Sequence, residues 1–134
     1  MRSVVLDTNI VLDAFVFDDP ASRPLKSALA AHQLKWIATQ AMRDELARVL
    51  GYPKLLPRLA YHRVNAAHVL AQFDGQSTQL DTPPKASVTC RDPDDQKFID
   101  LAVAHQAVLL SKDQAVLCMK KRLLALDVIA QVAI

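Results

Sequence analysis

Val4-Val5-Leu6-Asp7-Thr8-Asn9-Ile10 is the stretch of this chain that decides the fold. A short apolar run, from Ser3 to Leu6, stops abruptly at three polar residues. Such a run is typical of a strand that is buried on both faces, as the strands of parallel sheets are. We therefore predict the central strand of a sheet here, with Asp7 at its carboxyl end.

After this strand, helical and strand patterns alternate along the chain. Apolar residues at helical spacing predict helices over 10–17, 22–32, 40–50, 57–73, 93–105 and 114–124, with a turn at Asp74-Gly75. Short apolar runs predict strands over 35–38, 108–110 and 128–129, and a less defined one around 86–89. This alternation indicates the α/β class, an α/β/α sandwich with a central parallel sheet of about four to five short strands.

Length, composition and charge limit the kinds of protein that this chain can be. The chain has 134 residues, of which 51% are hydrophobic and 22% charged, and this predicts one globular domain over residues 1–134. The net charge of +2 permits contact with a polyanion without indicating it. Met1 and Arg2 lead directly into the first strand, and no apolar stretch reaches the roughly 18 residues of a membrane helix, so we expect a cytoplasmic protein with no membrane contact.

Four acids stand where predicted strands end or predicted helices carry their apolar face. They are Asp7, Glu45, Asp95 and Asp113. Ligands of parallel sheets bind at the carboxyl ends of the strands, and two of these acids follow strands there. Carboxylates beside apolar structure are costly unless a positive charge pairs with them, and four together need more positive charge than nearby side chains supply. A hard cation such as Mg²⁺ or Mn²⁺ fits such a set of ligands best.

Each of these acids also has an ordinary structural explanation. Asp7, Asp95 and Asp113 are placed to cap helices, because aspartate side chains accept hydrogen bonds from free N–H groups. Glu45 lies beside the apolar face of its helix, where Arg48 or Arg43 would neutralise it. One site that uses all four acids is nevertheless more economical than four separate explanations.

The same residues resemble the PIN domain family of metal-dependent ribonucleases, whose members include toxins of bacterial and archaeal toxin–antitoxin pairs. The stretch 4–10 is similar to the family's apolar strand followed by Asp, a small hydroxyl residue and Asn. Thr39 with Glu45-Leu46 resembles the hydroxyl-capped helix that bears the family's glutamate. The segment 95–113 resembles the family's acid-led helix, strand and final hydroxyl-x-Asp loop, so the resemblance covers essentially the whole chain.

Details of the match sharpen the resemblance. Arg91-Asp92-Pro93-Asp94-Asp95 is similar to a branch of the family described as toxins. Asp94 would replace Asp95 as a ligand if the helix began differently. Ser111 stands where threonine is common in the family and keeps the hydroxyl group.

The resemblance implies an endoribonuclease that depends on Mg²⁺ or Mn²⁺ and hydrolyses RNA phosphodiester bonds as the toxin of a toxin–antitoxin pair. It implies that Asp7, Glu45, Asp95 and Asp113 are the catalytic residues and hold one or two metal ions, directly or through water. It also implies a cognate antitoxin as partner and a homodimer.

The resemblance also suggests supporting roles. Thr8, Asn9 and Ser111 would orient ligands and waters around the metal. Lys112 and Arg43 would meet RNA phosphates, together with Arg58 or Arg63, although the alternative for all these cations is a solvated helix face.

Two other functions stay open at this stage. A phosphohydrolase like the haloacid dehalogenases would use Asp7 as a nucleophile, but Asn9 breaks the Asp-x-Asp pattern of those enzymes. An RNA- or protein-binding module would retain the fold without catalysis, with the acids serving as caps and surface ion pairs.

Overall fold

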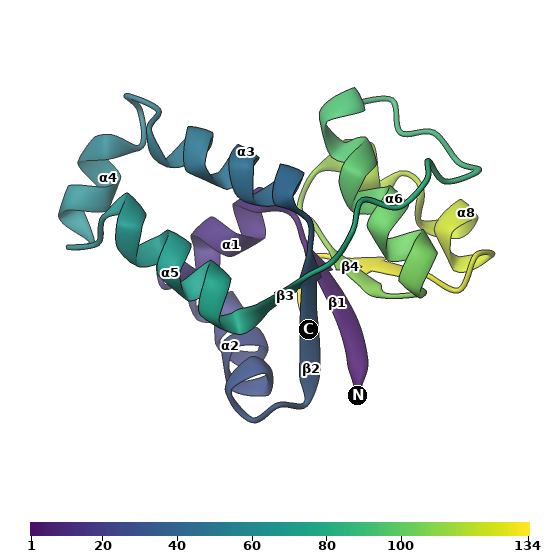
Figure 1. The fold of residues 1–134 in the computed structure, drawn as a ribbon, viewed down its shortest axis with the longest axis horizontal. Helices are drawn as coiled ribbons and strands as arrows, with labels where there is room; N and C mark the ends of the chain where they lie inside the picture. The colour runs from purple at the N-terminus through teal and green to yellow at the C-terminus, as the bar shows by residue number, and fades with distance from the viewer.

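Strand β1 (Arg2–Leu6) is the middle strand of a five-stranded parallel sheet in the computed structural model, which describes residues 1–134 (Figure 1). The strand order is β3-β2-β1-β4-β5. The other strands are β2 (Leu34–Ala38), β3 (Ser77–Gln79), β4 (Val108–Leu110) and β5 (Ile129–Gln131). The α/β class and the number of strands agree with the prediction from sequence.

The register of β1 explains its apolar sequence. Val4 pairs with Trp36 of β2 on one side and with Val108 of β4 on the other. Val4 and Val5 are both 0% exposed, because strands lie on both edges of β1 and helices on both faces. The buried part of β1, Val4 to Leu6, is therefore entirely apolar, and the first polar residue after it is Asp7, where the strand ends.

The helices form two groups. Before β3 the chain forms α1 (Thr8–Phe15), the 3₁₀ turn η1 (Pro20–Ser22), α2 (Arg23–Ala30), α3 (Gln40–Leu50), α4 (Leu56–Tyr61) and α5 (Ala66–Gln76). After β3 it forms the 3₁₀ turn η2 (Pro93–Asp95), α6 (Gln96–His105), α7 (Gln114–Leu117) and α8 (Lys120–Leu124). None of these helices has the length and apolar character that a membrane span requires.

The topology positions the functional edge of the sheet. The chain builds outward from β1 through β2 to β3, then returns to β4 on the other side of β1. Crossovers between parallel strands are right-handed, so this reversal puts α6 and α8 on the opposite face from α1, α2, α3 and α5, as Figure 1 shows. A reversal of strand order leaves a crevice at the carboxyl ends of the two strands concerned, here β1 and β4.

Aromatic packing anchors one face of the sheet. Trp36 is 2% exposed and stacks on Phe15 of α1, with ring centroids 5.6 Å apart. The ring of Phe73 from α5 stands nearly perpendicular to the same indole, with ring centroids 5.1 Å apart. Truncating a buried aromatic residue of this kind to alanine typically costs about 3–5 kcal/mol, so these contacts fix α1 and α5 against β2.

Two predictions of helices were wrong in extent. The helix predicted over 57–73 is broken into α4 and α5, because Asn65 caps α5 by accepting a hydrogen bond from the backbone N–H of His68 at 2.8 Å. Asp74 and Gly75 then lie within α5 and form no turn. The helix predicted over 114–124 is likewise two short helices, α7 and α8.

The strand predicted around 86–89 does not form, and the fifth strand is β3 instead. β3 consists of polar residues, yet it pairs in register with β2, with Ser77 opposite Trp36. The segment around Ala86 runs beside α6, where the Asp100 side chain accepts a hydrogen bond from the backbone N–H of Ala86 at 2.8 Å. An edge strand that is largely exposed needs no apolar residues, so the sequence gives no signal for it.

Candidate metal centre

Three aspartates from separate parts of the chain meet at the carboxyl edge of the sheet. Asp7 follows β1, Asp95 ends η2, and Asp113 follows β4. Each offers a carboxylate oxygen, and these three oxygens all lie within 4.8 Å of one another. Asp7 is 5% exposed and Asp95 7% exposed. We call this group the three-aspartate cluster.

Asp7 is held in place by Ser111. Its backbone N–H donates to the carbonyl oxygen of Leu110 at 3.0 Å, which ties the end of β1 to β4. Ser111 Oγ donates to Asp7 Oδ2 at 2.7 Å and accepts from the backbone N–H of Asp113 at 3.0 Å. Burial raises the pKa of the Asp7 carboxyl, and the Ser111 hydrogen bond opposes this rise.

Asp95 is the least satisfied group in the cluster. Its Oδ2 atom is buried and has no hydrogen-bond partner. Burial, followed by the contact with Asp113, raises the pKa of Asp95 to about 8. The same contact and a hydrogen bond from the backbone N–H of Ala115 lower the pKa of Asp113. Near neutral pH, Asp95 is therefore the protonated member of this pair and Asp113 the charged one.

Helix capping explains one of the three aspartates. Asp113 Oδ1 accepts from the backbone N–H of Ala115 at 2.9 Å and so caps α7. Asp7 and Asp95 stand at the N-cap positions of α1 and α6, but the side chain of neither makes a capping hydrogen bond. The two most buried carboxylates are thus the two that capping leaves unexplained.

The acids that precede Asp95 in the sequence have different roles in the structure. Asp92 caps η2 by accepting from the backbone N–H of Asp94 at 3.0 Å, as its position in the sequence indicates. The Asp94 side chain is exposed, whereas Asp95 is buried in the cluster. Of the two alternatives for a ligand in this run, the geometry therefore favours Asp95.

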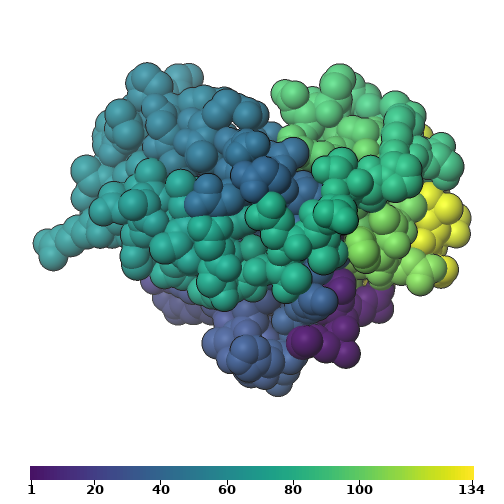
Figure 2. All heavy atoms as spheres, viewed as in Figure 1, coloured from purple at the N-terminus to yellow at the C-terminus, as the bar shows by residue number.

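Glu45, the fourth predicted ligand, lies outside the three-aspartate cluster. It projects from α3 and accepts a hydrogen bond from Thr8 Oγ1 on one oxygen and from Lys97 Nζ, at 2.8 Å, on the other. Lys97 belongs to α6, so this contact joins helices on opposite faces of the sheet. In Figure 2 the surface is notched between the blue atoms of α3 and the green atoms around α6.

The side chains of the other residues predicted to support the site are exposed or pair with residues outside the three-aspartate cluster. The Thr8 hydroxyl donates a hydrogen bond to Glu45, and the Asn9 side chain is exposed. Arg43 does not pair with Glu45, because its guanidinium makes two hydrogen bonds to Asp74, at 2.7 and 2.8 Å. These bonds lower the pKa of Asp74.

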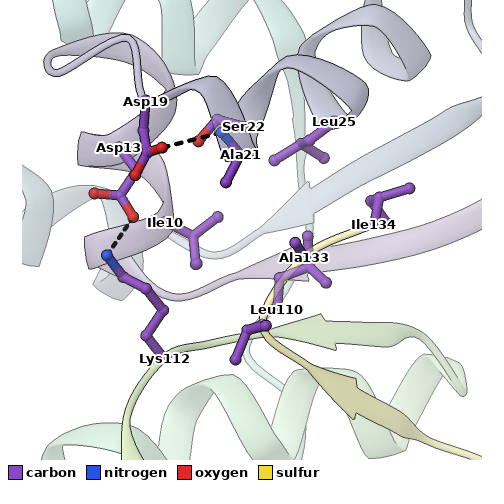
Figure 3. Close-up of a pocket in the computed structure, with 11 residues that line it drawn as sticks. Ile10, Asp13, Asp19, Ala21, Ser22, Leu25, Leu110, Lys112, Ala133 and Ile134 are labelled. Atoms are coloured by element: carbon purple, nitrogen blue, oxygen red, sulfur yellow. Dashed lines mark hydrogen bonds and ion pairs between the residues drawn. The ribbon is translucent and has the colours of Figure 1, made fainter.

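Lys112 also has a carboxylate partner, which the analysis of the sequence missed. Lys112 Nζ lies 2.5 Å from Asp13 Oδ2 at the rim of a small, largely apolar pocket between α1 and the C-terminal residues (Figure 3). Asp13 is buried on α1 in the otherwise apolar run 10–17. A lone acid in such a run was the available signal, since it requires a cation. The pair ties α1 to the loop that carries Ser111 and Asp113.

The three-aspartate cluster fits a hard divalent cation. The four ion pairs of the structure include Asp13 and Glu45 but none of the three clustered aspartates. Carboxylate oxygens are the preferred ligands of Mg²⁺ and Mn²⁺, and a cation here would both pair the buried charges and contact the unpartnered oxygen of Asp95.

Comparison with known proteins agrees with this fold. Residues 3–115 match the model of the PIN domain family. Among solved structures, the chain is similar to one in the crystal structure of VapBC2 from Rickettsia felis bound to a DNA fragment from their promoter, with a TM-score of 0.62 and 16% sequence identity over 96% of each chain. At this identity the similarity shows the fold alone. No protein with a curated description matches the chain.

Proposed function

The chain belongs to the PIN domain family, and from this premise we propose that it is a Mg²⁺- or Mn²⁺-dependent endoribonuclease and the toxin of a toxin–antitoxin pair. One observation carries the proposal: three aspartates converge at the switch point of the sheet with a buried, unpartnered oxygen on Asp95. Burying a carboxyl oxygen without a partner is costly, and without metal the raised pKa of Asp95 keeps this group protonated. A bound cation would give the oxygen a partner and stabilise the charged form.

In this proposal, some residues of the site bind the metal ion and others orient the ligands. Asp7, Asp95 and Asp113 would hold the ion directly or through water. When bound, a divalent cation makes a water molecule more acidic and stabilises negative charge on the reacting phosphate. Ser111 orients Asp7, and the backbone N–H of Ala115 orients Asp113. Asp95 would give up its proton when a cation binds, since its pKa is raised in the metal-free protein.

A stretch without acids supports an approach path for RNA. Residues 46–73 contain no Asp or Glu and carry four exposed cations, which are Arg48, Lys54, Arg58 and Arg63. The stretch begins one residue after Glu45 and includes α4 and most of α5. Exposed cations without neighbouring acids in the sequence would attract the phosphates of RNA. Arg43 and Lys112 are weaker candidates, because carboxylates already neutralise them.

The proposal extends to protein partners. The similar structure contains VapBC2 with promoter DNA, and this supports an antitoxin as the partner of the present chain. A homodimer is proposed on the resemblance to the family alone. Molar mass measured by light scattering, with and without a co-expressed candidate antitoxin, tests both partners.

Cleavage assays test the proposed activity. Purified protein would be incubated with single-stranded and structured RNA in Mn²⁺, Mg²⁺ or EDTA, beside Asp7→Asn and Asp95→Asn. Asp94→Asn is the matched control, because it removes the exposed carboxylate next to Asp95. We expect metal-dependent cleavage that both cluster variants lose and the control keeps. Cleavage that survives both substitutions would contradict the proposal, and an inactive protein that binds RNA would favour the non-catalytic module.

A further inference from the structure

Lys97 lies beside the three-aspartate cluster and neutralises the predicted ligand that the cluster leaves out. Its Nζ atom is 2.8 Å from Glu45 Oε1 and donates to the carbonyl oxygen of Asp94 at 2.6 Å. The other Glu45 oxygen accepts from Thr8. Both oxygens of Glu45 are therefore occupied by groups of the chain itself, in contrast to the bare oxygen of Asp95.

The helix dipole disfavours a cation at the position of Lys97, and the contact with Glu45 opposes this effect. Lys97 is the second residue of α6, where the positive end of the helix dipole opposes a cation. The side chains of Lys97 and Glu45 are only 25% and 16% exposed, so their attraction is less screened than at an open surface. A lysine at this place is explained by the carboxylate it meets.

Charge counting limits how many cations this group can hold. Asp7, Glu45, Asp95 and Asp113 carry at most four negative charges, and Lys97 removes one. One divalent ion would then leave the group with a single negative charge. A second would make it positive and would stand beside the ammonium group of Lys97, where like charges repel.

We infer that Lys97 occupies, as a built-in monovalent cation, the place at Glu45 that a second divalent ion would need. The chain accordingly binds one divalent ion at the three aspartates, and Glu45 joins in binding a second only when Lys97 is removed. This inference rests on the proposed metal-dependent function and settles, for this chain, the choice between one and two ions.

Counting bound Mn²⁺ by electron paramagnetic resonance tests the inference, because only free Mn²⁺ gives the sharp signal. The variants are Lys97→Met and Lys97→Gln; the glutamine keeps a donor for Glu45 and protects the fold. Lys26→Met is the matched control, since it removes the same charge from a lysine of α2 that is paired with Asp18. The double variant Lys97→Met with Glu45→Gln keeps the net charge of the wild type.

The expected result is one Mn²⁺ bound by the wild type, the control and the double variant. Both single variants of Lys97 should bind a second ion at least about tenfold more tightly than the control does. Two ions bound equally by the wild type and the Lys97 variants would overturn the inference and leave the proposed function intact. A wild type that binds no Mn²⁺ would overturn both.

Discussion

The three-aspartate cluster and the Glu45–Lys97 pair both contain partly or fully buried carboxyl groups, but they differ in whether the chain supplies partners for the carboxyl oxygens. Glu45 is partly buried, and each of its oxygens has a partner from the chain. Asp95 is more deeply buried, and its Oδ2 atom has none. The chain supplies partners for both oxygens of Glu45 but none for Asp95 Oδ2. This difference indicates that the partner of Asp95 is a bound ligand. The missing partner, more than the acid itself, marks the functional site.

The strongest test of this contrast is to neutralise one acid of each kind. Asp95→Asn should lower Mn²⁺-dependent RNA cleavage at least about a hundredfold, since it removes a direct metal ligand. Glu45→Gln should lower cleavage less, because its oxygens already serve Thr8 and Lys97. Initial rates at saturating Mn²⁺ measure both effects. A loss for Glu45→Gln as large as that for Asp95→Asn would erase the distinction between the two regions.

The stability of the protein should depend on metal through the cluster alone. Mn²⁺ at 100 times its dissociation constant should stabilise the wild type by about 2.7 kcal/mol, and Asp95→Asn should lose this gain. Without metal, Asp95→Asn should be as stable as the wild type or more so, because the raised pKa of Asp95 shows that its place in the fold favours a neutral side chain. Asp113→Ala should lose a helix cap and cost about 0.5–2 kcal/mol. Melting curves with Mn²⁺ or EDTA separate these outcomes; a metal-free Asp95→Asn that is clearly destabilised would contradict the account.

The stability of the metal-free protein should depend on pH through the ionisation of Asp95. Its pKa rises from 3.8 to about 8 on folding, so between these values the folded state binds more protons than the unfolded state. Stability from this group is therefore full at acid pH and is lost as the pH rises toward 8. The lowered pKa of Asp113 acts in the opposite direction at the acid end of the range. Melting temperatures in EDTA should fall from pH 5 to pH 8 in the wild type and stay flatter in Asp95→Asn; equal slopes would argue against the raised pKa of Asp95.

A separate effect on stability is expected at the Ser111 hydroxyl, which bonds to two members of the cluster. Ser111→Ala removes a hydrogen bond to Asp7 and leaves the backbone N–H of Asp113 without its partner. This should cost about 1–3 kcal/mol of unfolding free energy in the metal-free protein. Urea denaturation in EDTA measures the cost. An unchanged midpoint would show that Ser111 does not hold these groups in place.

The sequence predicted the features that depend on local apolar patterns. Runs of Val and Leu predict buried strands such as β1 and β4. Asp7 and Asp113 lie in the loops that follow these runs. β3 escaped prediction because it is a polar edge strand whose place depends on pairing with β2. Asn65 likewise looks like an ordinary helical residue until it caps α5.

The candidate site was predictable in its acids but not in its cations. The convergence of Asp7, Asp95 and Asp113 follows from the topology of a parallel sheet. The partner of Glu45 does not follow, because Lys97 comes from a helix on the other face of the sheet and Arg43 was nearer in sequence. Ion pairs between distant segments depend on tertiary packing, which local patterns do not record.

Binding of Mn²⁺ by the purified protein tests the central claim most directly. Electron paramagnetic resonance would compare the wild type with Asp95→Asn and with Asp94→Asn, which differ only in which neighbouring carboxylate is neutralised. The account predicts saturable binding by the wild type and Asp94→Asn, and its loss in Asp95→Asn. Equal binding by all three proteins, or binding by none, would contradict the claim that the three-aspartate cluster is a metal centre.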